Sequence, residues 1–181
     1  FLGLKDLSLI QTAPPKRQSI KTYLVKEDDK TLKSAIEKEL RRGGQVFIVH
    51  NRVKDIEHYT QKIRDLVPNS NIVYAHGQMK ENELERKMKD FYIGKYDILI
   101  STTIIESGID IPNANTMIID RADTFGLSQL HQLRGRIGRS DKKAYAYFII
   151  PHEKTITATA TKRLKALQTY ADMGSGFSIA S

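Results

Sequence analysis

Short apolar runs alternate with segments of helical period from residue 43 onward, and this alternation restricts the possible folds more than any other feature of the sequence. The runs are rich in Val and Ile and lack the polar alternation of a strand with one exposed face, so we expect them to be fully buried strands. They are QVFIVH (45–50), NIVYAH (71–76), YDILIS (96–101), NTMIID (115–120) and AYAYFII (144–150).

The segments between these runs carry apolar residues at steps of three and four, which is typical of amphipathic helices. One helix is marked by Leu32, Ile36 and Leu40 and is expected to end at Gly43-Gly44. A second helix follows, with Asn51 as its expected N-cap. The apolar positions of the second and third helices are Val53, Ile56, Tyr59, Ile63 and Leu66, and Leu84, Met88, Phe91 and Tyr92.

Strands that alternate with helices of this length pair in parallel through right-handed crossovers. The sequence therefore predicts an α/β fold, a three-layer α/β/α sandwich with a mainly parallel sheet, over residues 32–152. Functional loops of such sheets follow the carboxyl ends of the strands. We expect residues 50–52, 76–79 and 101–110 to lie along one edge.

The flanking regions have a different character. Residues 1–31, with Pro14-Pro15 and the charged cluster 26–30, are expected to be a connector, and a basic helix is expected to begin near Thr161. The apolar runs are much shorter than the roughly 20 residues that a membrane helix needs, so we expect a cytoplasmic protein without a membrane span.

Composition narrows the class of ligand. The chain carries 29 basic and 21 acidic side chains, a formal charge of +8, which suits a polyanionic partner such as nucleic acid or nucleotide phosphate. It has no cysteine, and its five histidines lack metal-ligand spacing, so we expect no bound metal in this domain. The sequence also lacks the G-x-x-x-x-G-K-[ST] phosphate loop, so we expect the chain alone to be inactive as an ATPase.

The stretch STTIIESGIDIP (101–112) is a candidate phosphate and sugar site. Thr102 and Thr103 leave a strand where backbone N–H groups of a following turn would also point outward, although Thr103 and Glu106 also match a capping box. Gly108 allows close approach of a ligand, and Asp110 offers a carboxylate to a ribose hydroxyl.

The stretch QLRGRIGRS (132–140) holds three arginines and two glycines. Arg136 and Arg139 are three residues apart, so they could address one phosphate group from two directions, as an arginine finger does. A solvated basic patch and a nucleic-acid contact are the alternatives, and Arg134 is expected to be structural or to face DNA.

Together these residues resemble a known family. AHGQM, TTIIESGIDIP and QLHQLRGRIGRS resemble motifs IVa, V and VI of superfamily 2 helicases and translocases. The wording SQLHQLRGRIGR is similar to the RecG and Mfd branch, and DRADTFGLSQLHQLRGRIGRS with KRLKALQTYADMGSGFSIA is similar to the bacterial transcription-repair coupling factors.

The resemblance implies the second RecA-like lobe of an ATP-dependent double-stranded DNA translocase. ATP and Mg²⁺ would be held mainly by a first lobe, and other domains would contact stalled RNA polymerase and the excision-repair protein UvrA. Residues 153–181 would begin a translocation hairpin. A RecG-like branch-migration helicase and a non-enzymatic nucleic-acid-binding module are the alternatives.

The resemblance also implies roles for individual residues. Catalytic contacts to the triphosphate fall to Gln132, Arg136 and Arg139, with Arg139 as the finger. Gly108 and Asp110 would lie near the ribose. The nucleic-acid-binding residues would be Thr102, Thr103, His76, Gly77, Asn51, Arg52 and Arg163.

Overall fold

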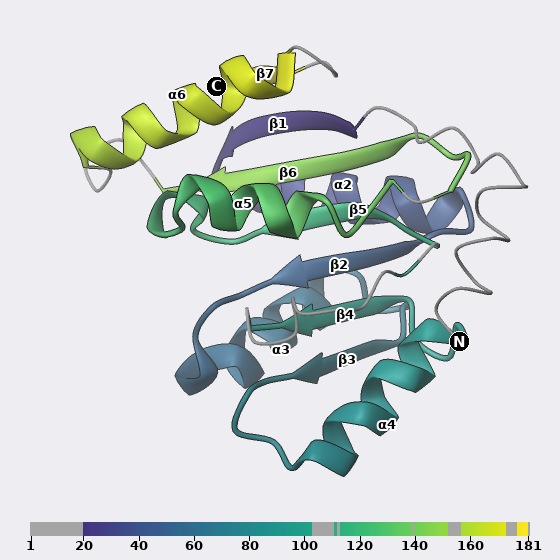
Figure 1. The fold of residues 1–181 in the computed structure, drawn as a ribbon. Coiled ribbons are helices and arrows are strands. Elements are labelled where there is room, and N and C mark those ends of the chain that lie inside the picture. The colour runs from purple at the N-terminus through teal and green to yellow at the C-terminus, as the bar shows by residue number, and fades with distance from the viewer. Residues whose placement is uncertain are drawn as a thin grey trace, which may run out of the picture.

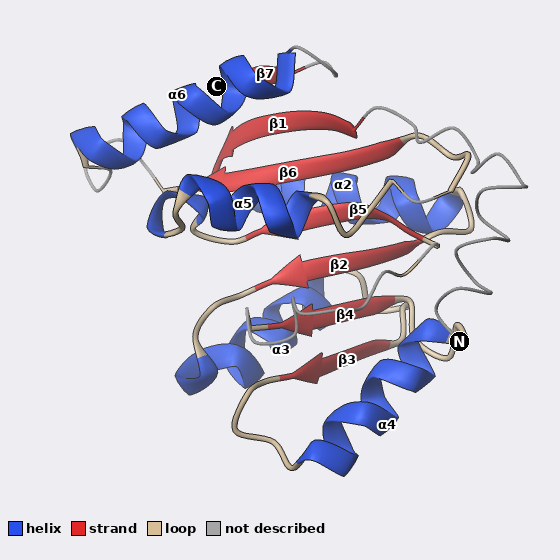
Figure 2. Cartoon of the chain, in the orientation of Figure 1, coloured by secondary structure: helices blue, strands red, loops and turns tan. Residues whose placement is uncertain are grey.

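The structure is a computed structural model that describes residues 20–102, 111, 113–138, 140–151, 157–172 and 177–180. Helices and strands alternate along most of this range (Figure 2). The strands are β1 (Ile20–Lys26), β2 (Gln45–Val49), β3 (Ile72–Ala75), β4 (Ile98–Ser101), β5 (Ala114–Ile119), β6 (Ala144–Ile150) and β7 (Phe177–Ala180). The helices are α2 (Asp29–Arg41), α3 (Ile56–Leu66), α4 (Glu81–Tyr92), α5 (Leu127–Arg134) and α6 (Ala158–Asp172), with 3₁₀ turns η1 (Val53–Asp55) and η3 (Ala122–Thr124).

The strands form one seven-stranded sheet in the order β3-β4-β2-β5-β6-β1-β7 (Figure 1). Every pairing between described strands is parallel. This topology confirms the expected α/β class, and it brings the carboxyl ends of all these strands to the same edge of the sheet.

Both faces of the sheet are buried, which explains the continuous apolar runs. Successive residues of a strand point to opposite faces, so Phe47 and Val49 enter one hydrophobic cluster while Val46 and Ile48 enter the other. The first cluster also contains side chains of α4, α5 and α6, and the second contains side chains of α2 and α3. Figure 1 shows the same arrangement, with α2 and α3 behind the sheet and α4 and α5 in front, so the molecule has three layers.

Strand β1 is the main departure from the sequence-based expectation. It lies within residues 1–31, which were predicted as a connector, yet it pairs with β6 on one side and β7 on the other. Its sequence, IKTYLVK, carries lysines at its second and last positions and a threonine at its third, so it lacks the long apolar run by which the other strands were recognised. Thr22 is nevertheless fully buried.

The helix boundaries follow local chemistry. The Asp28 side chain accepts hydrogen bonds from the backbone N–H groups of Lys30 and Thr31 and so caps α2, which ends as expected before Gly43 with φ of +80°. Asn51 is not the cap of α3, contrary to expectation, because the turn η1 comes first and Asp55 occupies the N-cap position.

Candidate functional site

The carboxyl ends of four neighbouring strands are tied together by backbone hydrogen bonds. His50 N–H donates to the Ser101 carbonyl at 2.8 Å, Thr102 N–H to that of Ala75 at 3.3 Å, and Asp120 N–H to that of Val49 at 2.9 Å. We call this region the carboxyl edge, and it comprises residues 50–52, 76–77, 102 and 120. The described part of the predicted loops therefore lies along one edge, as the sequence indicated.

His50 is held at this edge by two carboxylates and an aromatic ring. Its Nδ1 lies 2.8 Å from Oδ2 of Asp120, its Nε2 lies 2.7 Å from Oδ1 of Asp55, and its ring stacks on Tyr59 with centroids 4.2 Å apart. Burial lowers the pKa of His50, but the hydrogen bonds to the two carboxylates outweigh it and raise the pKa above its ordinary value. The hydrogen bond from His50 lowers the pKa of Asp55.

The predicted nucleic-acid residues differ in exposure. Asn51 and Gly77 are exposed, and the Arg52 side chain is 65% exposed with its Nε 3.7 Å from Oδ2 of Asp55. His76 Nδ1 accepts from the Gln78 backbone N–H at 3.2 Å. Thr102 is buried, and its Oγ1 has no hydrogen-bond partner among the described residues.

A pocket of about 290 Å³ opens at the carboxyl edge between the ends of β2 and β5. Arg52 and Arg121 contribute guanidinium groups to its lining, and Asn51 and Thr124 contribute neutral polar groups that can bond to a phosphodiester. His50 and Asp120 complete the lining. The pocket is thus polar and of mixed charge.

The arginine segment comprises residues 134–140, and its described residues, 134–138 and 140, lie away from this edge. Helix α5 runs back along the sheet, and Arg134 at its end donates from Nη1 to Thr22 Oγ1 of β1 at 3.2 Å. Ser140 Oγ donates to Oδ1 of Asn115, at the start of β5, at 3.1 Å. The described residues of the segment therefore lie near the beginnings of the strands, and Arg134 has the structural role that was one of its two expectations.

Apolar side chains at the start of the arginine segment and within it are buried in the core and fix the position of its backbone. Leu133 and Ile137 are both fully buried, and Gly138 has φ of +76°, a conformation that favours glycine. Gln132 is exposed on α5. Arg136 is half-buried and lies between the buried residues Leu133 and Ile137 in the sequence. A guanidinium in such partly desolvated surroundings suits a polyphosphate, because charge-assisted hydrogen bonds strengthen as water is excluded.

Several predicted residues lie outside the described part of the chain. They are Thr103, Gly108, Asp110 and Arg139. Within the described part, no group of three or more His, Asp or Glu side chains could hold a metal ion. None of the described helices is long and apolar enough to cross a bilayer.

Arg163 ties α6 to the rest of the lobe. Its Nη2 donates to the backbone carbonyl of Asp123 in η3, and the Asp123 carboxylate accepts from Nε and Nη2 of Arg121 at 3.1 and 3.0 Å. Arg121 itself adopts a left-handed backbone with φ of 52°. The N-terminal half of α6 is therefore joined, through η3, to Arg121 at the end of β5.

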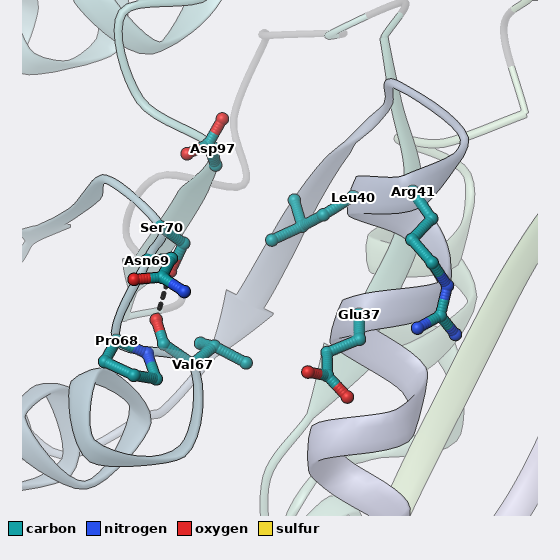
Figure 3. Close-up of a pocket in the computed structure, with 8 residues that line it drawn as sticks. All are labelled: Glu37, Leu40, Arg41, Val67, Pro68, Asn69, Ser70 and Asp97. Carbon is teal, nitrogen blue, oxygen red and sulfur yellow. Dashed lines mark hydrogen bonds between the residues drawn. The ribbon is translucent and has the colours of Figure 1, made fainter.

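A second pocket, of about 350 Å³, lies between the end of α2 and the loop after α3 (Figure 3). None of the residues that line it was predicted from the sequence as a site residue. They are Glu37, Leu40, Arg41, Val67, Pro68, Asn69, Ser70 and Asp97.

A family model described as the helicase conserved C-terminal domain matches residues 28–141. The chain belongs to this helicase family. The matched range covers α2 through the arginine segment, so both regions described above lie inside the helicase domain or at its boundary.

The helicase domain has close relatives among transcription-repair-coupling factors. That of Bacillus subtilis is 52% identical over 180 residues, covering 99% of this chain and 15% of the relative, and that of Escherichia coli is 49% identical over 179 residues, covering 99% and 16%. The chain thus spans about 15% of the length of these relatives. The resemblance predicted from the motifs is confirmed.

Solved structures agree with this fold. RecG bound to a three-way DNA junction matches with a TM-score of 0.74 and 36% identity, covering 90% of this chain and 22% of that one. The C-terminal domain of the DEAD-box protein Dbp5 matches with a TM-score of 0.61 and 20% identity, covering 90% and 89%, which supports the helicase lobe fold alone.

The cluster around His50 was not predicted from the sequence. Residue 50 was expected at the edge, but no role was predicted for His50, Asp55 or Asp120. A signal was available, because His50 and Asp120 each directly follow a buried strand, where side chains of neighbouring parallel strands meet. Asp55 could not be found in this way, because it lies in a turn.

Proposed function

We propose that this chain is the second motor lobe of an ATP-dependent double-stranded DNA translocase of the transcription-repair-coupling type. The observation that carries the proposal is the 52% identity with the Bacillus subtilis factor along 99% of the chain. In this proposal the whole protein acts in the cytoplasm on stalled RNA polymerase and recruits UvrA through other domains.

ATP would supply the free energy of the cycle, with Mg²⁺ bound mainly to the first lobe. Arg136 and Arg139 of this lobe would reach the triphosphate from across a cleft, with Gln132 beside them and Gly108 and Asp110 near the ribose. An arginine placed in this way contributes about 10³- to 10⁵-fold to the rate of phosphoryl transfer, because it stabilises developing charge. Closure of the lobes would depend on these contacts and opening on their loss.

The carboxyl edge would hold the DNA backbone during this cycle. Asn51 and Arg52 are exposed there, with His76-Gly77 on a neighbouring loop, and guanidinium and amide groups are common ligands of phosphodiesters. Thr102 and Thr103 would contribute backbone contacts, and Arg163 would transmit lobe movement to the hairpin that begins with α6.

The test uses a full-length factor that contains this lobe. Arg139→Ala is expected to leave nucleotide binding mostly intact and to lower ATP turnover by about 10³-fold or more. Arg64→Ala, which removes an exposed arginine of α3 outside both regions, is the matched control. ATP turnover at the wild-type rate in Arg139→Ala would falsify the finger assignment, and ATPase activity in the isolated chain would contradict its dependence on a first lobe.

A RecG-like branch-migration helicase is the second candidate, and the match to RecG on a three-way junction favours it. The two candidates differ in substrate. A branch-migration helicase unwinds three-way junctions with ATP, whereas the proposed translocase displaces a stalled polymerase from linear duplex. A non-enzymatic binding module is the third, and it predicts that Arg139→Ala changes no ATPase activity.

A further inference from the structure

The hydrogen bonds of His50 favour its protonated form. Both ring nitrogens lie within 2.8 Å of carboxylate oxygens, one from Asp55 and one from Asp120. An ionised carboxylate only accepts hydrogen bonds, so both ring nitrogens must donate, and only the imidazolium has two N–H groups. The geometry is therefore that of a charged histidine, in a side chain that is 7% exposed.

The surroundings of His50 contain few other groups that titrate. Tyr59 stacks on the ring from α3, and its burial holds the pKa of its hydroxyl well above the ordinary value, so it stays neutral. The charged groups around the ring and its pocket are Asp55, Asp120, Arg52 and Arg121, with Asp123 bound to Arg121. Glu27 from the end of β1, Asp29 and Lys62 lie on the other side of Tyr59 and Asp120. Loss of the His50 proton makes this whole set of groups more negative by one charge.

His50 connects three elements through this network. Its backbone follows β2, Asp120 follows β5, and Asp55 is the N-cap residue of α3. Residues 51–54, which include the start of η1, are therefore a short connection fixed at both ends, at His50 and at Asp55, and we call it the 51–54 loop. Arg52 lies in the middle of this loop and is oriented by its own backbone N–H, which donates to the His50 carbonyl at 2.9 Å.

We propose that His50 is a positioning residue whose proton holds the 51–54 loop in place and so makes phosphodiester binding by Asn51 and Arg52 dependent on pH. Loss of the proton leaves one carboxylate facing a nitrogen lone pair, which loosens the loop and makes the pocket more negative. The binding part of this inference rests on the proposed function, whereas the positioning part does not.

The positioning part is tested by NMR titration of the 181-residue chain from about pH 5.5 to pH 9, the range in which histidine can change charge. The backbone N–H signals of Asn51 and Arg52 are expected to shift with the same midpoint as the His50 ring. His58→Gln removes an exposed histidine of α3 and should leave this titration unchanged. Loop signals that stay constant while the His50 ring titrates would overturn the inference.

Asp120→Asn supplies the rescue variant. An amide N–H can donate to Nδ1 of a neutral imidazole, so the loop should stay in place without the extra proton and its pH dependence should disappear. His50→Gln should loosen the loop at every pH, because one amide cannot donate to two carboxylates in opposite directions. A loop in Asp120→Asn that still loosens with the wild-type midpoint would contradict the role of the proton.

The binding part is tested with a duplex DNA oligonucleotide at low salt, by fluorescence anisotropy. Affinity of the wild type should fall about three- to tenfold as His50 loses its proton, and by reciprocity DNA should raise the pKa of His50 by the matching amount. Asp120→Asn should lose this pH dependence. Equal pH profiles of wild type and His50→Gln would overturn the link to binding. No binding at any pH, with loop signals that still titrate, would count against the proposed DNA contact and leave the positioning role intact.

Discussion

The carboxyl edge and the arginine segment use cations in opposite ways. At the edge, Arg52 and His50 lie beside carboxylates, and the His50 ring is enclosed by them. Residues 134–140 hold three arginines and no carboxylate, and Arg134 bonds to the neutral hydroxyl of Thr22. Cations that are paired with carboxylates are held in a fixed position but attract an anionic ligand weakly. A local group of arginines suits a strongly charged phosphate group. In the proposed function, one lobe would thus separate two kinds of phosphate recognition at different ends of its sheet.

The largest expected effect tests whether the two regions are functionally separate. Arg136→Ala in a full-length factor should lower ATP turnover by about 10³-fold, while duplex DNA affinity changes little. Steady-state phosphate release and anisotropy measure the two quantities on the same preparation. An equal loss of both would show that the two regions act as one site.

The next effect concerns how the arginine segment is held. Ile137→Ala should lower the free energy of unfolding by about 2–5 kcal/mol, because a fully buried side chain is removed from a packed core. Ile93→Ala is the matched control, since Ile93 is 64% exposed, and it should change stability by less than about 0.5 kcal/mol. Urea denaturation of the 181-residue chain measures both. Similar values for the two variants would mean that Ile137 does not anchor the segment.

A smaller effect is expected at the carboxyl edge. Arg52→Ala should weaken duplex DNA binding uniformly across sequences and reduce the slope of log affinity against log salt by about 1, as for loss of one phosphate contact. Arg64→Ala should leave the slope unchanged. An unaltered slope in Arg52→Ala would remove this residue from the DNA surface.

The smallest expected effect is on how the free energy of unfolding changes with pH. Because the pKa of His50 is raised in the folded chain, its contribution is fully present below its ordinary value of 6.5 and is lost as pH rises through the folded value. The lowered pKa of Asp55 has the opposite sign, so that contribution is present above 3.8 and is lost on acidification. Denaturation at several pH values should show the alkaline loss in wild type and not in His50→Gln.

The sequence predicted what depends on buried apolar periodicity. Each apolar run became a strand, because both faces of the sheet are buried, so that residues such as Ile118 on one face and Met117 on the other must be apolar. β1 was not predicted because its sequence contains two lysines and Thr22. The buried hydroxyl of Thr22 is satisfied by a residue distant in the sequence, since it accepts a hydrogen bond from Arg134. Such partners come from the tertiary fold, which local patterns do not encode.

The candidate site was predictable to a similar extent. The order of strands and loops was enough to place Asn51, Arg52 and His76 together, because parallel strands end at one edge. It was also enough to bring His50 and Asp120 to that edge, but not to add Asp55, since that contact depends on the short turn before α3, where the expected cap at Asn51 gave way to η1. The separation of the arginine segment from this edge likewise required the direction of α5.

The position of β1 has a consequence for how the chain is made. β1 is among the first described residues to be synthesised, but its neighbours in the sheet are β6, with Ile20 opposite Ala144, and β7. A nascent chain can build β2 to β5 early, yet β1 has no partner strand until residues 144–150 have left the ribosome. Such late, long-range pairing slows folding and leaves strand edges exposed in the meantime. The growing lobe would therefore benefit from chaperones that cover an open sheet edge during translation.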